Sequence, residues 1–312
     1  MTREGAGTGT VLGQQHAHSP ALPSGDLAGK ASAENFPVAL RMLPRRHREH
    51  LMAVYAFART VDDVGDEAPP DQRQQLLADL AEDLERLYAN LPGGQMGAPG
   101  STGSPAAEPR DPAVRGLAKV AADCAVPIQP FRDLIAANQQ DQVVLRYQTF
   151  EDLLGYCQLS ANPVGRIVLY VFGCSTPSRA ELSDFVCSGL QVVEHLQDVA
   201  EDFRAGRIYL PLDDLRSHGC TEADLSAPSA SPQLRSLIAA EAARAAALIT
   251  AGAPLVGQLR GAARAAVAGY VAGGRAALAA LAKAQYDVLS VTPRPSKGRT
   301  ALGLVSVLVR GR

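Results

Sequence analysis

Residues Tyr55–Glu67 read YAFARTVDDVGDE, a segment in which polar and apolar residues recur with the period of an α-helix. With about 3.6 residues per turn, positions four, seven and eleven residues after the first share its helix face. Four polar residues have this spacing: Tyr55, Arg59, Asp62 and Asp66. The segment therefore predicts a long, largely buried helix that carries a phenol, a guanidinium and two carboxylates in one stripe.

A second segment, Leu190–Pro211 (LQVVEHLQDVAEDFRAGRIYLP), repeats this spacing in the other half of the chain. Its stripe consists of Gln191, His195, Asp198 and Asp202. If the two helices face each other, four carboxylates converge, and they repel one another unless a cation lies between them. Carboxylate oxygens suit Mg²⁺, which also takes oxygens from a substrate phosphate. The pair predicts a site for Mg²⁺ and a diphosphate, whereas one D-x-x-x-D motif alone is more often an exposed helix face.

Arginines near both stripes are candidates for binding the diphosphate, because the planar guanidinium fork matches phosphate oxygens. They are Arg45, Arg46 and Arg48 before the first stripe, and Arg204 and Arg207 after the second. Each of them can equally be an ordinary surface charge.

The chain is predicted to be all-α, because Ala, Leu, Arg, Glu and Gln dominate and alternating β-branched runs do not recur. The expected helices cover residues 44–67, 72–88, 112–124, 129–138, 151–173, 179–205, 234–251, 254–272 and 274–289. We expect one domain over residues 31–300, preceded by a disordered tail, residues 1–30, and followed by a short tail, residues 301–312.

Composition excludes several classes of protein. The 312 residues include 30 Lys and Arg against 32 Asp and Glu, with 5% aromatic residues and no Trp, which does not suit nucleic-acid binding. Five Cys without a C-x-x-C pair indicate reduced thiols. The N-terminus carries no apolar signal region. We therefore expect a cytoplasmic protein without nucleic-acid partners.

At both stripes the sequence resembles the squalene/phytoene synthase family. The first family motif, Y-x-x-x-R-x-x-D-x-x-x-D, is matched by the first stripe, and the second, D-x-x-x-D followed by R-x-Y-x-P, is matched by Asp198, Asp202, Arg207, Tyr209 and Pro211. The resemblance implies a single-domain isoprenoid synthase fold with helices around an apolar cavity. It implies catalytic roles for Tyr55, Arg59, Gln191 and the four aspartates, which would bind Mg²⁺ or Mn²⁺. Arg45, Arg207 and Tyr209 would bind a prenyl diphosphate.

Three further segments resemble the branch of this family that forms hydroxysqualene for bacterial hopanoids. They are Glu34–Arg48 (ENFPVALRMLPRRHR), Leu159–Gly173 (LSANPVGRIVLYVFG) and Ala284–Leu289 (AQYDVL). In the second segment Asn162 and Pro163 replace the Gly and Thr of phytoene synthases, so Asn162 and Gly165 are expected beside the substrate, although a kink without functional meaning is the alternative. The sequence departs from the family pattern at Glu194, Gln197 and Gly274, where Asn, Arg and an aromatic residue are usual.

The resemblance implies an enzyme that ionises presqualene diphosphate and quenches the cation with water, without NADPH. Candidates for positioning the water are Tyr55, Gln191, Asn162 and His195, and apolar walls are expected near Phe57, Leu169, Phe172 and Phe185. The alternatives are a presqualene diphosphate, dehydrosqualene or phytoene synthase that condenses two prenyl diphosphates, or a helical scaffold without activity.

A lipid substrate implies contact with a membrane surface and with the enzymes before and after this one in the pathway. The C-terminal residues 301–312 (ALGLVSVLVRGR) are too short to span a bilayer but long enough to lie on one. The alternative is a final helix that packs on its own domain.

Overall fold

The computed structural model describes residues 43–91, 107–295 and 297–311 of the chain, and its regular elements there are helices. This confirms the predicted all-α class; the expected tail, residues 1–30, lies outside the described residues. In chain order the elements are α3 (Arg45–Glu67), α4 (Arg73–Ala89), α5 (Pro112–Gly116), α6 (Ala118–Cys124), α7 (Gln129–Asp141), α8 (Phe150–Ser160), α9 (Asn162–Val171), α10 (Pro177–Gln197), α11 (Val199–Arg204), α12 (Leu212–Ser217), the 3₁₀-helix η1 (Glu222–Ser226), α13 (Pro232–Gly252), α14 (Leu255–Gln258), α15 (Gly261–Lys283) and α16 (Lys297–Arg310).

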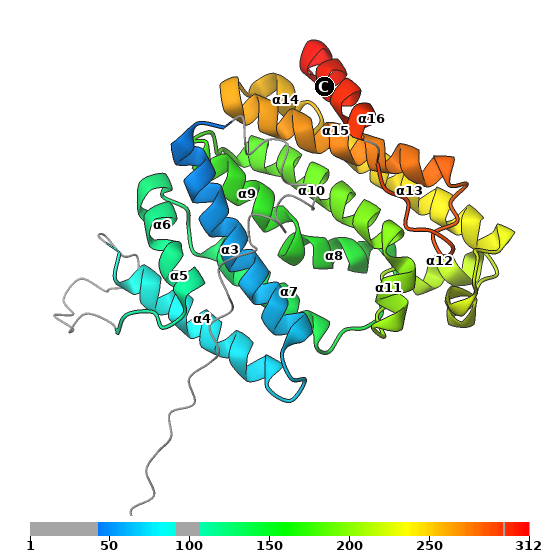
Figure 1. The fold of residues 1–312 in the computed structure, drawn as a ribbon, viewed down its shortest axis with the longest axis horizontal. Helices are drawn as coiled ribbons and strands as arrows, with labels where there is room; N and C mark the ends of the chain where they lie inside the picture. The colour runs from blue at the N-terminus through cyan, green and yellow to red at the C-terminus, as the bar shows by residue number, and fades with distance from the viewer. Residues whose placement is uncertain (1–42, 92–106, 296, 312) are drawn as a thin grey trace, which may run out of the picture.

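Two apolar cores meet at α9. The first core lies among helices α3, α4, α5, α6 and α7. Its largest fully buried side chains include Phe57 and Phe131. The second core joins α8 and α10 to α13 and α15. Helix α9 contributes Ile167 and Val168 to the first core and Leu169 to the second. In Figure 1, α3 lies in the half that holds α4, while α13, α15 and α16 lie on the opposite side of α10.

Local signals set the start of several helices. The side chain of Thr149 accepts a hydrogen bond from the Asp152 backbone, and the Asp152 side chain accepts one from the Thr149 backbone, a reciprocal cap at the start of α8. Thr176 caps α10 and Ser231 caps α13 in the simpler way, by accepting a hydrogen bond from the backbone N–H of the third residue of the helix. Each of these helices begins within three residues of its predicted start.

Three predicted helices are each divided in two, so their predicted continuity is wrong. The division at Ala161, between α8 and α9, precedes Pro163, which lacks the N–H that a continuous helix needs. A second division, at Asp198, separates α10 from α11. A third, at Leu117, separates α5 from α6.

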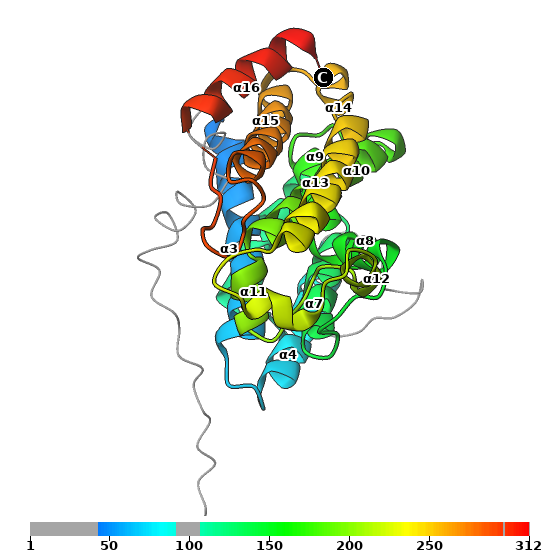
Figure 2. The ribbon, with the colours of Figure 1, turned by 90° about the vertical axis from the view of Figure 1, so that its right-hand side faces the viewer.

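The helices predicted over residues 254–272 and 274–289 are also wrong, because α15 runs without a break through Gly273 and Gly274. Gly274 serves close packing here instead of ending a helix. A Cβ at this position would lie 2.7 Å from both Ile249 Cδ1 and Leu190 Cδ2, so α15 approaches α13 and α10 at a distance that a side chain would prevent. The expected boundary at residue 300 falls inside α16, which packs against α15 (Figure 2).

Two segments, Pro232–Gln258 and Gly261–Lys283, are long and apolar enough to cross a membrane by length and composition. About half of each is buried inside the fold, 44% and 50% of the most apolar windows. Their helices α13 and α15 both pack against α10. These are the contacts of core helices.

Candidate active site

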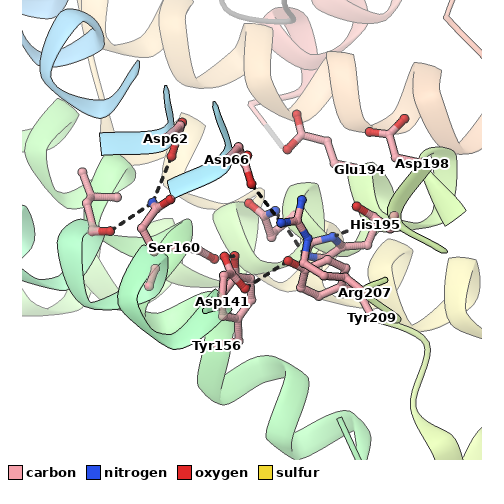
Figure 3. Close-up of a pocket in the computed structure, with 15 residues that line it drawn as sticks. Asp62, Asp66, Asp141, Tyr156, Ser160, Glu194, His195, Asp198, Arg207 and Tyr209 are labelled. Atoms are coloured by element: carbon pink, nitrogen blue, oxygen red, sulfur yellow. Dashed lines mark hydrogen bonds and ion pairs between the residues drawn. The ribbon is translucent and has the colours of Figure 1, made fainter. Parts of the chain in front are cut away.

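A cavity of about 310 Å³ lies where α3, α7, α8, α10 and α11 meet (Figure 3). Most of its lining is polar. The residues that line it are Asp62, Asp66, Leu134, Ala137, Asn138, Asp141, Tyr156, Ser160, Gln191, Glu194, His195, Asp198, Asp202, Arg207 and Tyr209. The cavity therefore joins the aspartates of both sequence stripes, together with Gln191, Arg207 and Tyr209 from the predicted site.

Helix α3 contributes Asp62 and Asp66 to the cavity. Asp62 Oδ1 accepts a hydrogen bond of 3.0 Å from the amide of Asn138 on α7. Asp66 Oδ1 accepts one of 2.8 Å from Arg207 Nη1, which reaches α3 from the turn after α11. The two carboxylates of the stripe thus have different partners, an amide and a cation.

Helices α10 and α11 contribute the opposite wall. Asp198 lies at the break between them, where it ends one helix and precedes the next, and Asp202 lies one turn further along α11. Glu194, at the place where the family usually has Asn, also lines the cavity, so this wall carries one more carboxylate than expected. Gln197 does not line it: its amide donates to the carbonyl of Pro293 in the protein interior.

One side of the cavity consists of aromatic residues that are held by hydrogen bonds and ring stacking. Tyr156 donates to Asp141 Oδ2 at 2.6 Å, and Tyr209 donates to Asp141 Oδ1 at 3.0 Å. The imidazole of His195 stacks on the ring of Tyr209 with 3.8 Å between centroids, and its Nε2 lies 3.2 Å from the amide nitrogen of Gln191. These contacts fix the orientation of the side chains that a ligand would meet.

The cavity disfavours negative charge on three of its acids. Asp62 is open to the cavity on one side, but protein surrounds the carboxylate elsewhere; this burial, with the charge of Asp66 adding to it, raises its pKa to about 6. Burial and the neighbouring charge of Asp202 also raise the pKa of Asp198. Burial raises the pKa of Asp141, although the phenol hydrogen bonds oppose the shift. A cation bound here would relieve the repulsion.

The donor chemistry fits Mg²⁺ better than a metal held by protein alone. Within the described parts of the chain, no three His, Cys, Asp or Glu side chains gather closely enough to hold one ion by themselves. The carboxylates that line the cavity come from three places: α3 contributes Asp62 and Asp66, the wall of α10 and α11 contributes Glu194, Asp198 and Asp202, and α7 contributes Asp141. Mg²⁺ accepts such an arrangement, because it retains waters and takes substrate phosphate oxygens as further ligands.

Two residues of the first stripe lie outside this cavity. Arg59 pairs with Asp63 at 2.6 Å and with Glu67 at 3.2 Å. Both of these acids lie on α3 but outside the predicted stripe. Tyr55, two turns before Asp62, is likewise absent from the lining of the cavity.

Three predicted substrate-binding residues also lie elsewhere. Arg45 is at the start of α3, about 25 Å along the helix from Asp62, and pairs with Glu49 on the surface. Asn162 is buried and accepts a hydrogen bond of 2.9 Å from Ser188. Gly165 lets α9 approach α10, since a Cβ there would overlap Ser183 Oγ. Of the expected apolar walls, Phe57 and Leu169 are buried in the cores, but Phe185 is exposed.

Sequence reasoning missed four polar residues that line the cavity, Asn138, Asp141, Tyr156 and Ser160, and two apolar ones, Leu134 and Ala137. The predicted helix over residues 129–138 stops three residues too early, which leaves Asp141 in a loop instead of on the helix face that it shares with Asn138. Tyr156 and Ser160 are one turn apart on α8, a spacing that places them on one face. This signal was present in the sequence.

The helices and the acidic cavity define an isoprenoid synthase fold. Residues 30–300 match the family model described as squalene/phytoene synthase, and the chain belongs to this family. Members of the family act on prenyl diphosphates.

The similar proteins within this family carry the names of different enzymes. The chain is 36% identical over 228 residues to the hydroxysqualene synthase of Rhodopseudomonas palustris, covering 73% of this chain and 72% of the relative. It is 31% identical to the phytoene synthase of Mycobacterium tuberculosis over 187 residues, 60% of this chain and 56% of the relative. Among solved structures, a squalene synthase from Alicyclobacillus acidocaldarius has 39% identity and a TM-score of 0.72, covering 84% of this chain and 94% of that one. A dehydrosqualene synthase with a bound ligand has 25% identity and a TM-score of 0.77, covering 91% and 94%.

Proposed function

We propose that the protein is a hydroxysqualene synthase, which converts presqualene diphosphate and water to hydroxysqualene and diphosphate. The observation that carries the proposal is the cavity in which the acids of α3 face those of α10 and α11, with Arg207 between them. Support for the particular reaction comes from hydroxysqualene synthases that are 34–36% identical to this chain, and from the Asn162–Arg166 segment.

The chain's own contribution to diphosphate binding is one arginine and two pairs of carboxylates. Arg207 already donates to Asp66, so a diphosphate arriving in the cavity would exchange one anionic partner of the guanidinium for another. Asp62 with Asp66, and Asp198 with Asp202, would hold Mg²⁺, or Mn²⁺ in its place. The bound cation supplies neutralising charge for the departing diphosphate.

The reaction balances without a reductant. The C–O bond to diphosphate breaks and its electron pair leaves with the diphosphate. The cyclopropylcarbinyl cation rearranges, and the oxygen of one water molecule forms the new C–O bond. The proton released by that water goes to the diphosphate. Because no carbon gains a hydride, we propose that NADPH is not required.

Two hydroxyl groups of the cavity are held in a fixed orientation. Tyr156 and Tyr209 direct their hydroxyl hydrogens to Asp141, so both phenols are held in fixed positions. Preoriented groups of this kind need no reorganisation when charge develops, which is the main way in which enzymes stabilise it.

A coupling enzyme is the second candidate. The similarity to a phytoene synthase and to a dehydrosqualene synthase favours it. Such an enzyme would condense two prenyl diphosphates and must bind two diphosphate groups at once. A scaffold without activity is the third, and the retained aspartates at all four motif positions argue against it.

Product analysis separates these candidates. Purified protein with Mg²⁺ and without NADPH is incubated with presqualene diphosphate in one sample and with farnesyl diphosphate in another, and the extracts are analysed by mass spectrometry. We expect hydroxysqualene from the first sample alone. Presqualene diphosphate or a C30 hydrocarbon from the second would assign the protein to the coupling branch. Failure of both would leave geranylgeranyl diphosphate and the inactive scaffold to be tested.

We further propose that the enzyme works on the cytoplasmic face of a membrane, between the enzyme that supplies its lipid substrate and the one that consumes its product. Helix α16 could contact the lipid, although its packing on α15 supports the alternative of a purely structural helix. Liposome flotation of the intact protein and of a variant lacking residues 301–312 tests this, since unchanged binding would rule out a role for α16.

A further inference from the structure

Three hydroxyl groups line the cavity, and one of them differs from the other two. Tyr156 and Tyr209 both donate to Asp141. Ser160 Oγ is enclosed by protein and has no hydrogen-bond partner among the described residues. A buried hydroxyl without a partner costs on the order of 1–3 kcal/mol, so this serine requires a physical explanation.

The position of Ser160 is set by the break between two helices. It is the last residue of α8, one turn after Tyr156, and Figure 3 shows it beside Tyr156 and Asp141 in the wall of the cavity. Directly after it the chain turns into α9, where buried Asn162 accepts a hydrogen bond from Ser188 on α10. The break at Ala161, directly before Asn162 and Pro163, therefore sets the end of α8 and, with it, the position of Ser160.

No described residue holds the Ser160 hydroxyl in its present rotamer. The Ser160 side chain as a whole is half-buried and faces the cavity, so rotation about its Cα–Cβ bond brings Oγ to the cavity surface. There the hydroxyl can accept one hydrogen bond and donate another, which is the pairing that a water molecule needs. Rotation also removes the cost of the enclosed, unpaired oxygen.

The surroundings suit a water held next to a cation. Leu134 and Ala137 give this part of the cavity its apolar lining, from the helix that packs against α8. Gln191, an uncharged polar side chain on the opposite wall, lies within hydrogen-bond distance of His195.

We propose that Ser160 holds the water molecule that captures the carbocation, an inference that rests on the proposed hydroxysqualene synthase function. The water donates one hydrogen bond to Ser160 Oγ and directs a lone pair at the cationic carbon. Its oxygen forms the C–O bond, and its second proton passes to the diphosphate that has just departed. Ser160 itself gains and loses no proton in the overall step. Without Ser160, the cation forms but loses a proton from carbon to the departed diphosphate, which gives an oxygen-free C30 product.

The test is the partition of products, since this separates water capture from ionisation. Presqualene diphosphate is turned over by the wild type, Ser160→Ala and Ser160→Thr, and both the released diphosphate and the C30 products are quantified. For Ser160→Ala we expect diphosphate release within a few-fold of wild type and about a tenfold lower ratio of hydroxysqualene to oxygen-free C30 products, equivalent to ~1.4 kcal/mol. Ser160→Thr, which keeps a hydroxyl, restores the ratio.

Ser183→Ala is the matched control, because Ser183 is also a buried serine but lies at the contact between α9 and α10. We expect it to keep the wild-type ratio. A wild-type ratio in Ser160→Ala would overturn the inference, and so would an equal loss of diphosphate release and alcohol, which indicates a merely structural role. If the wild type itself forms no hydroxysqualene, the proposed function fails first and the inference fails with it.

Discussion

Asn138 extends from α7 over the backbone of Gly65 on α3 and donates a hydrogen bond of 3.0 Å to Asp62. A Cβ at Gly65 would overlap Asn138 Oδ1, so the contact exists because position 65 has no side chain. Gln142, the residue directly after α7, donates to the carbonyl oxygen of Gly65 at 3.2 Å. The orientation of a candidate metal ligand thus depends on a glycine three residues away.

Gly65→Ala is therefore expected to reduce activity and stability together. The added methyl group must displace the Asn138 amide, at a cost of about 1–3 kcal/mol in the free energy of unfolding. The displaced amide no longer orients Asp62, so we expect at least a tenfold lower kcat. Denaturant unfolding and steady-state kinetics measure the two effects.

Gly155→Ala provides the control, since Gly155 lies within α8 and a Cβ there meets nothing within 4 Å. This change should leave stability the same or raise it by about 0.5–1 kcal/mol, because alanine is the better helix former. Equal behaviour of the two alanine variants would show that the Gly65 contact has no special role.

Substitution of the acids on either wall should abolish turnover without unfolding the protein. Asp62→Asn and Asp198→Asn each remove a charged oxygen donor from the cavity and leave the cores intact. We expect at least a hundredfold loss of kcat with unchanged circular dichroism. Asp79→Asn, on the exposed face of α4, should retain wild-type kcat. Full activity in either cavity variant would reject the metal-site interpretation.

Ligand binding gives a second readout for the same variants. Mg²⁺ together with inorganic diphosphate should raise the Tm of the wild type, because a ligand that binds only the folded state stabilises it. The rise should be absent in Asp62→Asn and should disappear when EDTA removes the metal. A rise of the same size without metal would assign diphosphate binding to Arg207 alone.

Stability should fall with rising pH because of Glu241. Its side chain is 1% exposed on α13, and burial together with nearby Asp214 raises its pKa to about 7, against the opposing effect of Arg244. The folded protein keeps this proton after the unfolded chain has lost it, so stability declines between the ordinary glutamate pKa and pH 7. Glu241→Gln should therefore raise the free energy of unfolding at pH 8 by up to about 3 kcal/mol, which appears as a higher Tm. At pH 4 the Tm should be nearly unchanged. An equal rise at both pH values would contradict this cause.

Neighbouring glycines of α15 should respond in opposite ways to alanine. At Gly274 the new Cβ lies 2.7 Å from Ile249 and Leu190, so we expect a loss of about 1–3 kcal/mol. At Gly273 nothing lies within 4 Å, and the same change should be neutral or stabilising. Thermal unfolding of the two variants, side by side, tests whether the close approach of α15 has the expected cost.

Helical period was sufficient to predict the fold class and to locate α3 and α10, because each of these two helices buries one broad apolar face. It also identified the aspartates that the structure brings into one cavity. It could not predict where helices divide or which residues meet. Arg59 has the spacing of the stripe but pairs with Asp63, and Asp141 reaches the cavity only because α7 continues three residues beyond its expected end. Such outcomes depend on packing partners far away in sequence.

The bond between Arg207 and Asp66 joins residues 141 positions apart and thereby links the two halves of the chain. Contacts of such long range form late, because closing a long loop costs entropy before any contact repays it. During refolding, helical content should therefore recover before the cavity exists, and catalytic turnover should recover last. The time course of regained activity would then report the docking of the two cores on each other, a step that circular dichroism does not detect.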